Sequence, residues 1–207
     1  MDKKAVYILE QVCKLYKRYG IKSVTMDDVA KHLCISKKTL YEHFHDKEDL
    51  VKEVMLMEHE HRNKVIQEIE NKGLNSIEEV LEVYQLLQKM FREYNPSMEY
   101  DLRKYYPDLF NKIKETRRKT MFESTQRNMN KGKKEGLYRK DLNTVILAKL
   151  HVFRVENLFE NDVFSLEELS SFKVTHEIFV YHLHGIMSLE GLNVFEANFA
   201  KIKAGLG

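Results

Sequence analysis

The sequence predicts an all-α protein, in which an N-terminal three-helix helix-turn-helix domain is joined to a larger helical bundle. Only two prolines and eight glycines interrupt its 207 residues, and strong helix formers such as Lys, Glu and Leu dominate the composition. Apolar residues also recur at spacings of three and four along the whole chain. No segment shows a convincing strand pattern.

The first helix is expected between Lys3 and Tyr19. Ile8, Val12 and Leu15 share one face there, because residues three and four apart meet on a helix. Gly20 follows directly, and glycine is the residue that most often ends a helix.

Two short helices are expected next, joined by a three-residue turn. Thr25 is a typical N-cap, and the aspartates Asp27 and Asp28 stand in the first turn, where the helix dipole favours negative charge. Ser36 is the N-cap of the second short helix, which covers Lys37 to Phe44. Together they form a helix-turn-helix.

The remaining helices are longer, and caps or helix breakers bound them. Ser76 with Glu79 and Ser165 with Glu168 have the spacing of capping boxes. Gly191 is expected to end the helix that begins after the second box. The expected helices are Lys47 to Asn71, Ser76 to Tyr94, Ser97 to Tyr105, Asp108 to Glu135, Thr144 to Glu160, a helix reaching Glu190, and Val194 to Lys203.

The change from short to long helices predicts two domains without a flexible linker. Residues 1–46 are expected to form a helix-turn-helix DNA-binding domain. Residues 47–207 are expected to form a helical domain for effector binding and dimerisation.

Composition narrows the function classes. The formal charge of +2 is too small to indicate nucleic acid by itself. Cys13 and Cys34 form neither a disulfide framework nor a metal-binding pair, and His59 and His61 stand two apart, which places them on different helix faces. No leader, membrane span, phosphate loop or nucleophile elbow is present. We therefore expect a cytoplasmic protein that is not an enzyme and has no metal or cofactor.

The segment "SKKTLYEHFHDKEDL", residues 36–50, is polar at its start and apolar along one side. In a helix-turn-helix the second helix enters the DNA major groove, and its N-terminal residues reach base edges. Lys37, Lys38 and Thr39 occupy that first turn. Leu40 and Phe44, one turn apart, are expected to face the preceding helices.

The run "YGIKSVTMDDVAKHLCISKKTLYEHFHDKEDLVKEVM", residues 19–55, resembles the DNA-binding module of the TetR family of transcriptional regulators. "EGLYRKDLNT", residues 135–144, resembles a loop common in the second domain of that family. The features that match in the first run are Gly20, Thr25, Val29-Ala30, Leu40-Tyr41, Phe44, Lys47 and Leu50.

The resemblance implies a mostly dimeric repressor whose second domain binds a small molecule. Two positions depart from the family pattern, because Cys34 stands where glycine is usual and Asp27 where some members have a basic residue. The residues expected to meet base edges or the groove are Lys37, Lys38 and Tyr41, in the helix that Ser36 opens. Those expected to hold phosphates are Thr25, Thr39, His43 and Lys47.

An unknown effector, apolar or aromatic, is expected in the second domain, which is rich in aromatic residues and methionine. Most of these side chains must be core, but flexible Met and aromatic walls also suit a ligand pocket. His151 and Arg154 have apolar neighbours and are candidates to orient a polar or anionic ligand group. The other candidate ligand-binding residues are Phe91, Tyr94, Met98, Tyr105, Phe110, Met121 and Phe122.

The helices over 144–160 and 173–190 are apolar on more than one face. A helix with two apolar faces needs two partners, and the second partner is expected to be the same helix pair of another chain. Gly185 would permit a close approach of helices. The apolar residues include Ile146, Leu150, Phe153, Ile178, Phe179, Leu183, Ile186 and Met187.

The sequence therefore predicts a homodimeric transcriptional regulator, a ligand-responsive repressor on a palindromic operator in double-stranded DNA. The alternative is a helical protein–protein adaptor whose helix-turn-helix no longer binds DNA. The first 50 residues keep this alternative open, since they hold ten Lys and Arg against eight Asp and Glu.

Overall fold

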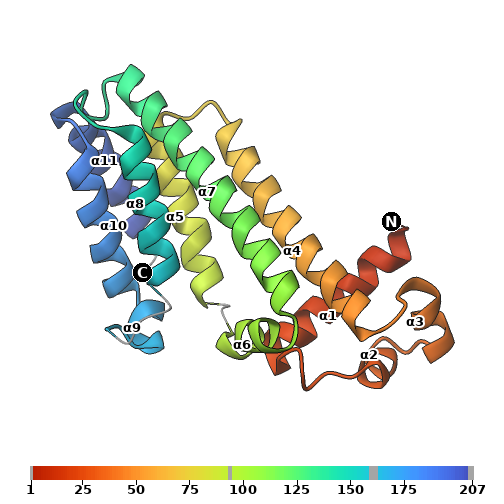
Figure 1. Ribbon diagram of the computed structural model, residues 1–207. Helices are drawn as coiled ribbons and strands as arrows, with labels where there is room; N and C mark the ends of the chain where they lie inside the picture. The colour runs from red at the N-terminus through yellow and green to blue at the C-terminus, as the bar shows by residue number, and fades with distance from the viewer. Residues whose placement is uncertain (1, 93–94, 159–162, 205–207) are drawn as a thin grey trace. The chain divides into compact units, whose positions relative to one another are not determined.

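The computed structural model describes residues 2–92, 95–158 and 163–204, and they confirm an all-α fold (Figure 1). No strand forms in these residues, although one isolated antiparallel bridge joins Tyr138 and Met187. The helices are α1 (Lys3–Tyr19), α2 (Met26–His32), α3 (Lys37–His43), α4 (Lys47–Glu70), α5 (Ser76–Arg92), α6 (Pro96–Tyr105), α7 (Pro107–Glu135), α8 (Thr144–Asn157), α9 (Leu166–Ser170), α10 (Phe172–Ile186) and α11 (Leu189–Ala204).

The chain divides into two compact units. The first unit contains Met1–Lys64 and Glu93–Arg117, and the second contains Val65–Arg92 and Arg118–Gly207. The helix-turn-helix segment and α6 belong to the first unit, and α4 and α7 contribute residues to both. These units are defined by how compactly the chain packs and not by function, so the expected DNA-binding domain at residues 1–46 stays a prediction.

The core of the first unit is built on α1. Its apolar face buries Ile8, Val12 and Tyr16, which share one cluster with Leu40 and Phe44 of the third helix region. The spacing of apolar residues in the sequence therefore predicts correctly which faces of α1, α2 and α3 are buried.

The helix α6 packs beside α1 in the first unit (Figure 1). The side-chain amide of Asn95 donates to the carbonyl of Lys17 at 2.7 Å. The carboxylate of Asp101, which is 8% exposed, accepts from the backbone N–H of Lys22 at 2.7 Å. The loop before α2 is thereby held by a residue far along the chain.

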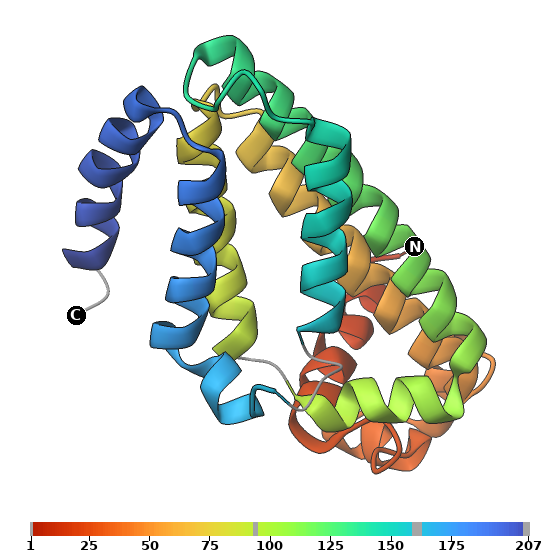
Figure 2. The ribbon, with the colours of Figure 1, turned by 60° about the vertical axis from the view of Figure 1, so that its left-hand side comes forward.

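In the second unit, α5 packs beside both α10 and α11 (Figures 1 and 2). A polar network runs through its core. The amide of Asn128 donates to Glu79 at 2.9 Å, and the Lys131 ammonium donates to the same carboxylate at 2.6 Å. The Tyr138 hydroxyl donates to Asn128 at 2.9 Å. The buried Glu79 thus has both a cation and a neutral donor, as a buried charge requires.

Three details of the expected helices are wrong. The single helix expected from the capping box at Ser165 to Glu190 is divided into α9 and α10, and Ser171 is the N-cap of α10. Asn75, rather than Ser76, caps α5: its side chain accepts from two backbone N–H groups, and Glu78 accepts from the N–H of Asn75. Gly191 lies inside α11 and does not end a helix. A Cβ there would lie 2.0 Å from the backbone oxygen of Leu137, so close packing explains this glycine.

Candidate functional site

The helix α3 is positioned by its cap and by two apolar anchors. The Ser36 hydroxyl accepts from the N–H of Thr39 at 3.0 Å, as an N-cap does. Leu40 is fully buried, and Phe44 is 2% exposed. A helix of seven residues is too short to be stable alone, so these anchors hold it in place.

The opposite side of α3 is open to solvent. Tyr41 is 50% exposed, and Lys37 and Lys38 are exposed in the first turn. An aromatic ring and two ammonium groups on one exposed edge can contact bases and phosphates. As expected from the sequence, α3 therefore has exposed polar residues in its first turn and a buried apolar side.

Asp27 on α2 faces Lys37 on α3. Their charged atoms lie 2.7 Å apart, and both side chains are largely exposed. The hydrogen bond and charge of Asp27 raise the pKa of Lys37. Lys37 therefore carries its charge at neutral pH, but Asp27 competes with any phosphate for it.

The turn between α2 and α3 contains a backbone conformation that glycine adopts most easily. Cys34 has φ 52°, in the left-handed region, and its side chain is exposed. A non-glycine residue thus holds a left-handed conformation in this turn. Strain of this kind costs about 1 kcal/mol.

The other expected phosphate contacts lie around these two helices. Thr25 caps α2 and donates its hydroxyl proton to Asp28 at 2.6 Å. Lys47 is partly buried and donates to the carbonyl of Lys22 at 3.2 Å. Burial lowers the pKa of Lys47.

His43 is only partly exposed. Its side chain is 16% exposed, and its Nδ1 lies 3.7 Å from the carboxylate of Asp2, the N-cap of α1.

The expected effector residues are divided between the two units. In the first unit, Met98 and Phe110 pack against the core, whereas Tyr105 is 39% exposed with the Lys22 ammonium over its ring. Tyr94 and the side chain of Phe91 lie outside the described residues.

In the second unit, Met121 and Phe122 are partly buried on α7. His151 and Arg154 of α8 are in contact, with 3.1 Å between Nδ1 and Nη2. Among the residues expected to bind the effector, the structure therefore places the polar residues His151 and Arg154 in contact.

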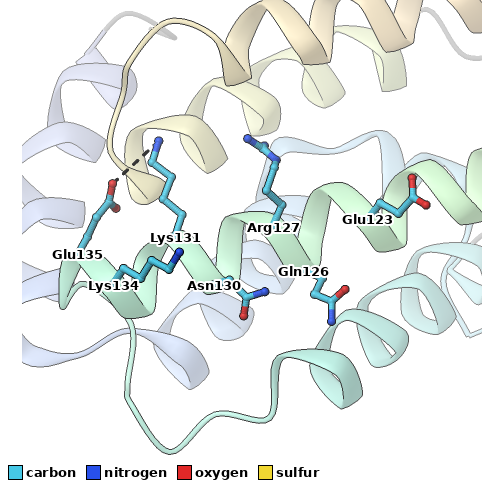
Figure 3. A pocket seen from close by; sticks show the side chains of 7 residues that line it. All are labelled: Glu123, Gln126, Arg127, Asn130, Lys131, Lys134 and Glu135. Carbon is cyan, nitrogen blue, oxygen red and sulfur yellow. Dashed lines mark ion pairs between the residues drawn. The ribbon is translucent and has the colours of Figure 1, made fainter.

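A hollow of about 500 Å³ lies along α7 in the second unit (Figure 3). Lys131 and Glu135 form an ion pair at 3.9 Å on one side of it. Every lining residue comes from this one helix, so the hollow is an open polar groove, and it contains none of the expected effector residues. The lining residues are Glu123, Gln126, Arg127, Asn130, Lys131, Lys134 and Glu135.

Sequence reasoning missed three positions that shape these regions. Asn95 bonds to the last turn of α1, Asp101 bonds to the loop before α2, and His182 of α10 has its ring 5.3 Å from that of His151. The local sequence does not reveal these contacts, because each partner is distant in the chain.

No group of three or more His, Cys, Asp or Glu side chains in the described residues could hold a metal ion. No helix in that part of the chain is long and apolar enough to cross a membrane.

Residues 8–54 match the family of bacterial regulatory proteins, tetR family. Among solved structures, the chain is similar to a transcriptional regulator from Cytophaga hutchinsonii, with 22% identity, TM-score 0.73, and coverage of 90% of this chain and 100% of that one. A TetR-family regulator from Agrobacterium tumefaciens has 16% identity, TM-score 0.68, and coverage of 89% and 98%. A gamma-butyrolactone receptor has 13% identity, TM-score 0.65, and coverage of 99% and 100%. No curated protein matches the chain.

Proposed function

We propose that this chain, whose residues 8–54 match the tetR family of bacterial regulatory proteins, is a ligand-responsive repressor that binds a palindromic operator as a homodimer. The observation that carries the proposal is that Lys37, Lys38 and Tyr41 of α3 are exposed, whereas Leu40 of the same helix is buried.

We propose that α3 enters the major groove with its N-terminal turn toward the bases. The exposed ring of Tyr41 suits apolar contact with a base or sugar, and Lys38 has no competing ion pair among the described residues. The proposed contact set is Thr25, Ser36, Lys37, Lys38, Thr39, Tyr41, His43 and Lys47.

The test is a selection of duplexes from a random pool with the purified protein. The repressor proposal expects an enriched inverted repeat, because two identical α3 helices related by a two-fold axis read two identical half-sites. An unenriched pool would contradict sequence-specific binding.

Asp27→Asn is expected to strengthen DNA binding roughly fivefold and to steepen the log–log salt dependence by about 0.9 per protomer. The reason is that Asp27 holds Lys37 at 2.7 Å and adds a negative charge near α3. Fluorescence anisotropy over a salt series measures both quantities. In a Lys37→Met background the gain from Asp27→Asn should shrink, since the competed cation is gone. An undiminished gain would show that Lys37 does not contact DNA.

The homodimer is supported by an exposed apolar stripe on α8. Ile146, Leu150 and Phe153 are 60%, 55% and 64% exposed, and their spacing places them on one face. On α10, Tyr181 is 83% exposed, and a Cβ added at Gly185 would meet nothing within 4 Å. We propose that the two helices form a four-helix interface with the same pair of a second chain.

Phe153→Asp is expected to weaken the dimer roughly 100-fold or more, because the two-fold axis places both new charges in one apolar interface. Sedimentation over a concentration series measures the dissociation constant. Leu189→Asp is the matched control: Leu189 is 82% exposed on α11 of the same unit but outside the stripe, so it should leave the dimer intact. Equal dimerisation of the Phe153 variant and the wild type would place the interface elsewhere.

We also propose that the effector acts through the contacts of α6. Asn95 donates to the carbonyl of Lys17 in the last turn of α1, and Asp101 accepts from the N–H of Lys22 in the loop before α2. An effector that favours another position of α6 would shift the loop that sets α2 and α3. The shift is limited by the difference in the affinity of the effector for the two states.

A further inference from the structure

A basic cluster joins α8 to α10 in the second unit. His151 and Arg154 lie one turn apart on α8, and the Arg154 Nη2 donates to His151 Nδ1 at 3.1 Å. The ring of His182 on α10 lies 5.3 Å from the ring of His151. Because Arg154 can only donate, His151 accepts at Nδ1 and carries its proton on Nε2. Three basic side chains thus meet with at least one imidazole N–H still free to donate to a ligand.

Among the residues that the structure describes, no carboxylate forms an ion pair with this cluster. Arg154 is partly buried, and within the described residues its guanidinium bonds only to the neutral imidazole of His151. Glu156 of the same helix is instead held by Arg118 through three hydrogen bonds of 3.0, 3.2 and 2.8 Å. Removing an arginine from water without a counter-ion is costly, and buried arginines are normally paired.

The histidines add donors without adding charge. Burial and the charge of Arg154 lower the pKa of His151 to about 4. Burial, followed by the charges of Arg154 and His151, lowers the pKa of His182 to about 3. At neutral pH the cluster therefore carries one positive charge. It suits a monoanion with a planar pair of oxygens better than a doubly charged phosphate.

The surroundings of His182 on α10 are partly apolar. One turn earlier, Phe179 stacks on Tyr84 of α5, with ring centroids 4.0 Å apart and planes 15° apart. Another turn earlier, Thr175 accepts a hydrogen bond from Gln88 of α5 at 2.5 Å. The aromatic pair therefore lies one helical turn along α10 from His182.

We propose that Arg154 binds a carboxylate group of the effector, with His151 and His182 as neutral hydrogen-bond donors and the Tyr84–Phe179 pair against its apolar body. This inference rests on the proposed ligand response and gives the effector a chemical class, an amphipathic monocarboxylate.

The test measures thermal unfolding of the full chain with small probes that need little room. Acetate at about 100 mM, at constant ionic strength with chloride, is expected to raise the Tm by about 3 °C, whereas its neutral isostere acetamide is not. Arg154→Met should abolish the acetate response. It should also raise the Tm without ligand, because it removes an unpaired buried charge. Arg118→Met removes a paired guanidinium of the same unit and should keep the acetate response.

A longer probe tests the Tyr84–Phe179 pair. Octanoate should bind at least about tenfold more tightly than acetate, and Arg154→Met should lose at least about tenfold of that affinity in calorimetry. Octanol, which lacks the charge, should not distinguish wild type from the variant.

Three results would overturn the proposal. The first is that acetate does not raise the Tm of the wild type. The second is that acetate raises the Tm of Arg154→Met equally. The third is that Arg154→Met lowers the Tm and dissociates the dimer, which would make Arg154 an interface residue. The DNA assay separates this inference from the proposed function. Operator binding without an acetate response removes only the carboxylate proposal, whereas an acetate response without DNA binding leaves the ligand site and removes the repressor.

Discussion

Gly191→Ala is expected to destabilise the protein by about 3 kcal/mol. The added Cβ would lie 2.0 Å from the backbone oxygen and 3.0 Å from the carbonyl carbon of Leu137, and 3.3 Å from the Cδ1 of Ile77. A backbone atom cannot rotate away as a flexible side chain can. The same Leu137 oxygen accepts from the N–H of Ser188 at 3.0 Å, so moving it also disturbs the start of α11. Equilibrium denaturant unfolding measures the loss.

Gly185→Ala is the matched control for this prediction. Gly185 also lies inside a helix, α10, but a Cβ there would meet nothing within 4 Å. Since alanine favours helix over glycine, this change should stabilise by up to about 1 kcal/mol. Both changes are made in the Phe153→Asp background, so that dimerisation does not affect the comparison. Equal stability of the two variants would contradict the close packing of α11 against residue 137.

Leu40→Ala is expected to cost about 3 kcal/mol of stability and to abolish operator binding. Leu40 is fully buried in the first core, and α3 has only seven residues, so its position depends on this contact. Amide hydrogen exchange over residues 37–43 should report the loss of local protection, together with a lower denaturant midpoint.

Tyr41→Ala separates folding from recognition. Tyr41 is the next residue of the same helix, but it is 50% exposed. Its removal should change stability by no more than about 0.5 kcal/mol. DNA affinity should nevertheless fall roughly tenfold or more, as expected for loss of a base contact. If Tyr41→Ala unfolds the domain as Leu40→Ala does, or leaves DNA affinity unchanged, the assigned faces of α3 are wrong.

The first unit shows how much local sequence signals can predict. The caps Thr25 and Ser36, the inward Leu40 and Phe44, and the end of α1 at Gly20 with φ 81° are all confirmed. These features depend on residues within about one turn of each other, so the sequence around each position contains the whole cause.

The features that sequence reasoning missed depend on distant partners. Asp101 bonds to Lys22 across 79 positions, and Gly191 is required by a carbonyl 54 residues earlier. The His151–His182 contact likewise needs α8 and α10 to be adjacent. Spacing along one helix cannot reveal such pairs, which is why the sequence suggested a polar role for His151 and Arg154 but not for His182.

The most direct test of the repressor account is fluorescence anisotropy of the wild-type protein on its selected duplex and on a scrambled duplex over a salt series. We expect tight, sequence-selective binding whose log affinity falls with log salt at a slope of about −4 or steeper, as for a dimer that neutralises several phosphates. Weak binding that is equal on both duplexes and insensitive to salt would contradict the account, and is what a helical adaptor without DNA-binding activity predicts.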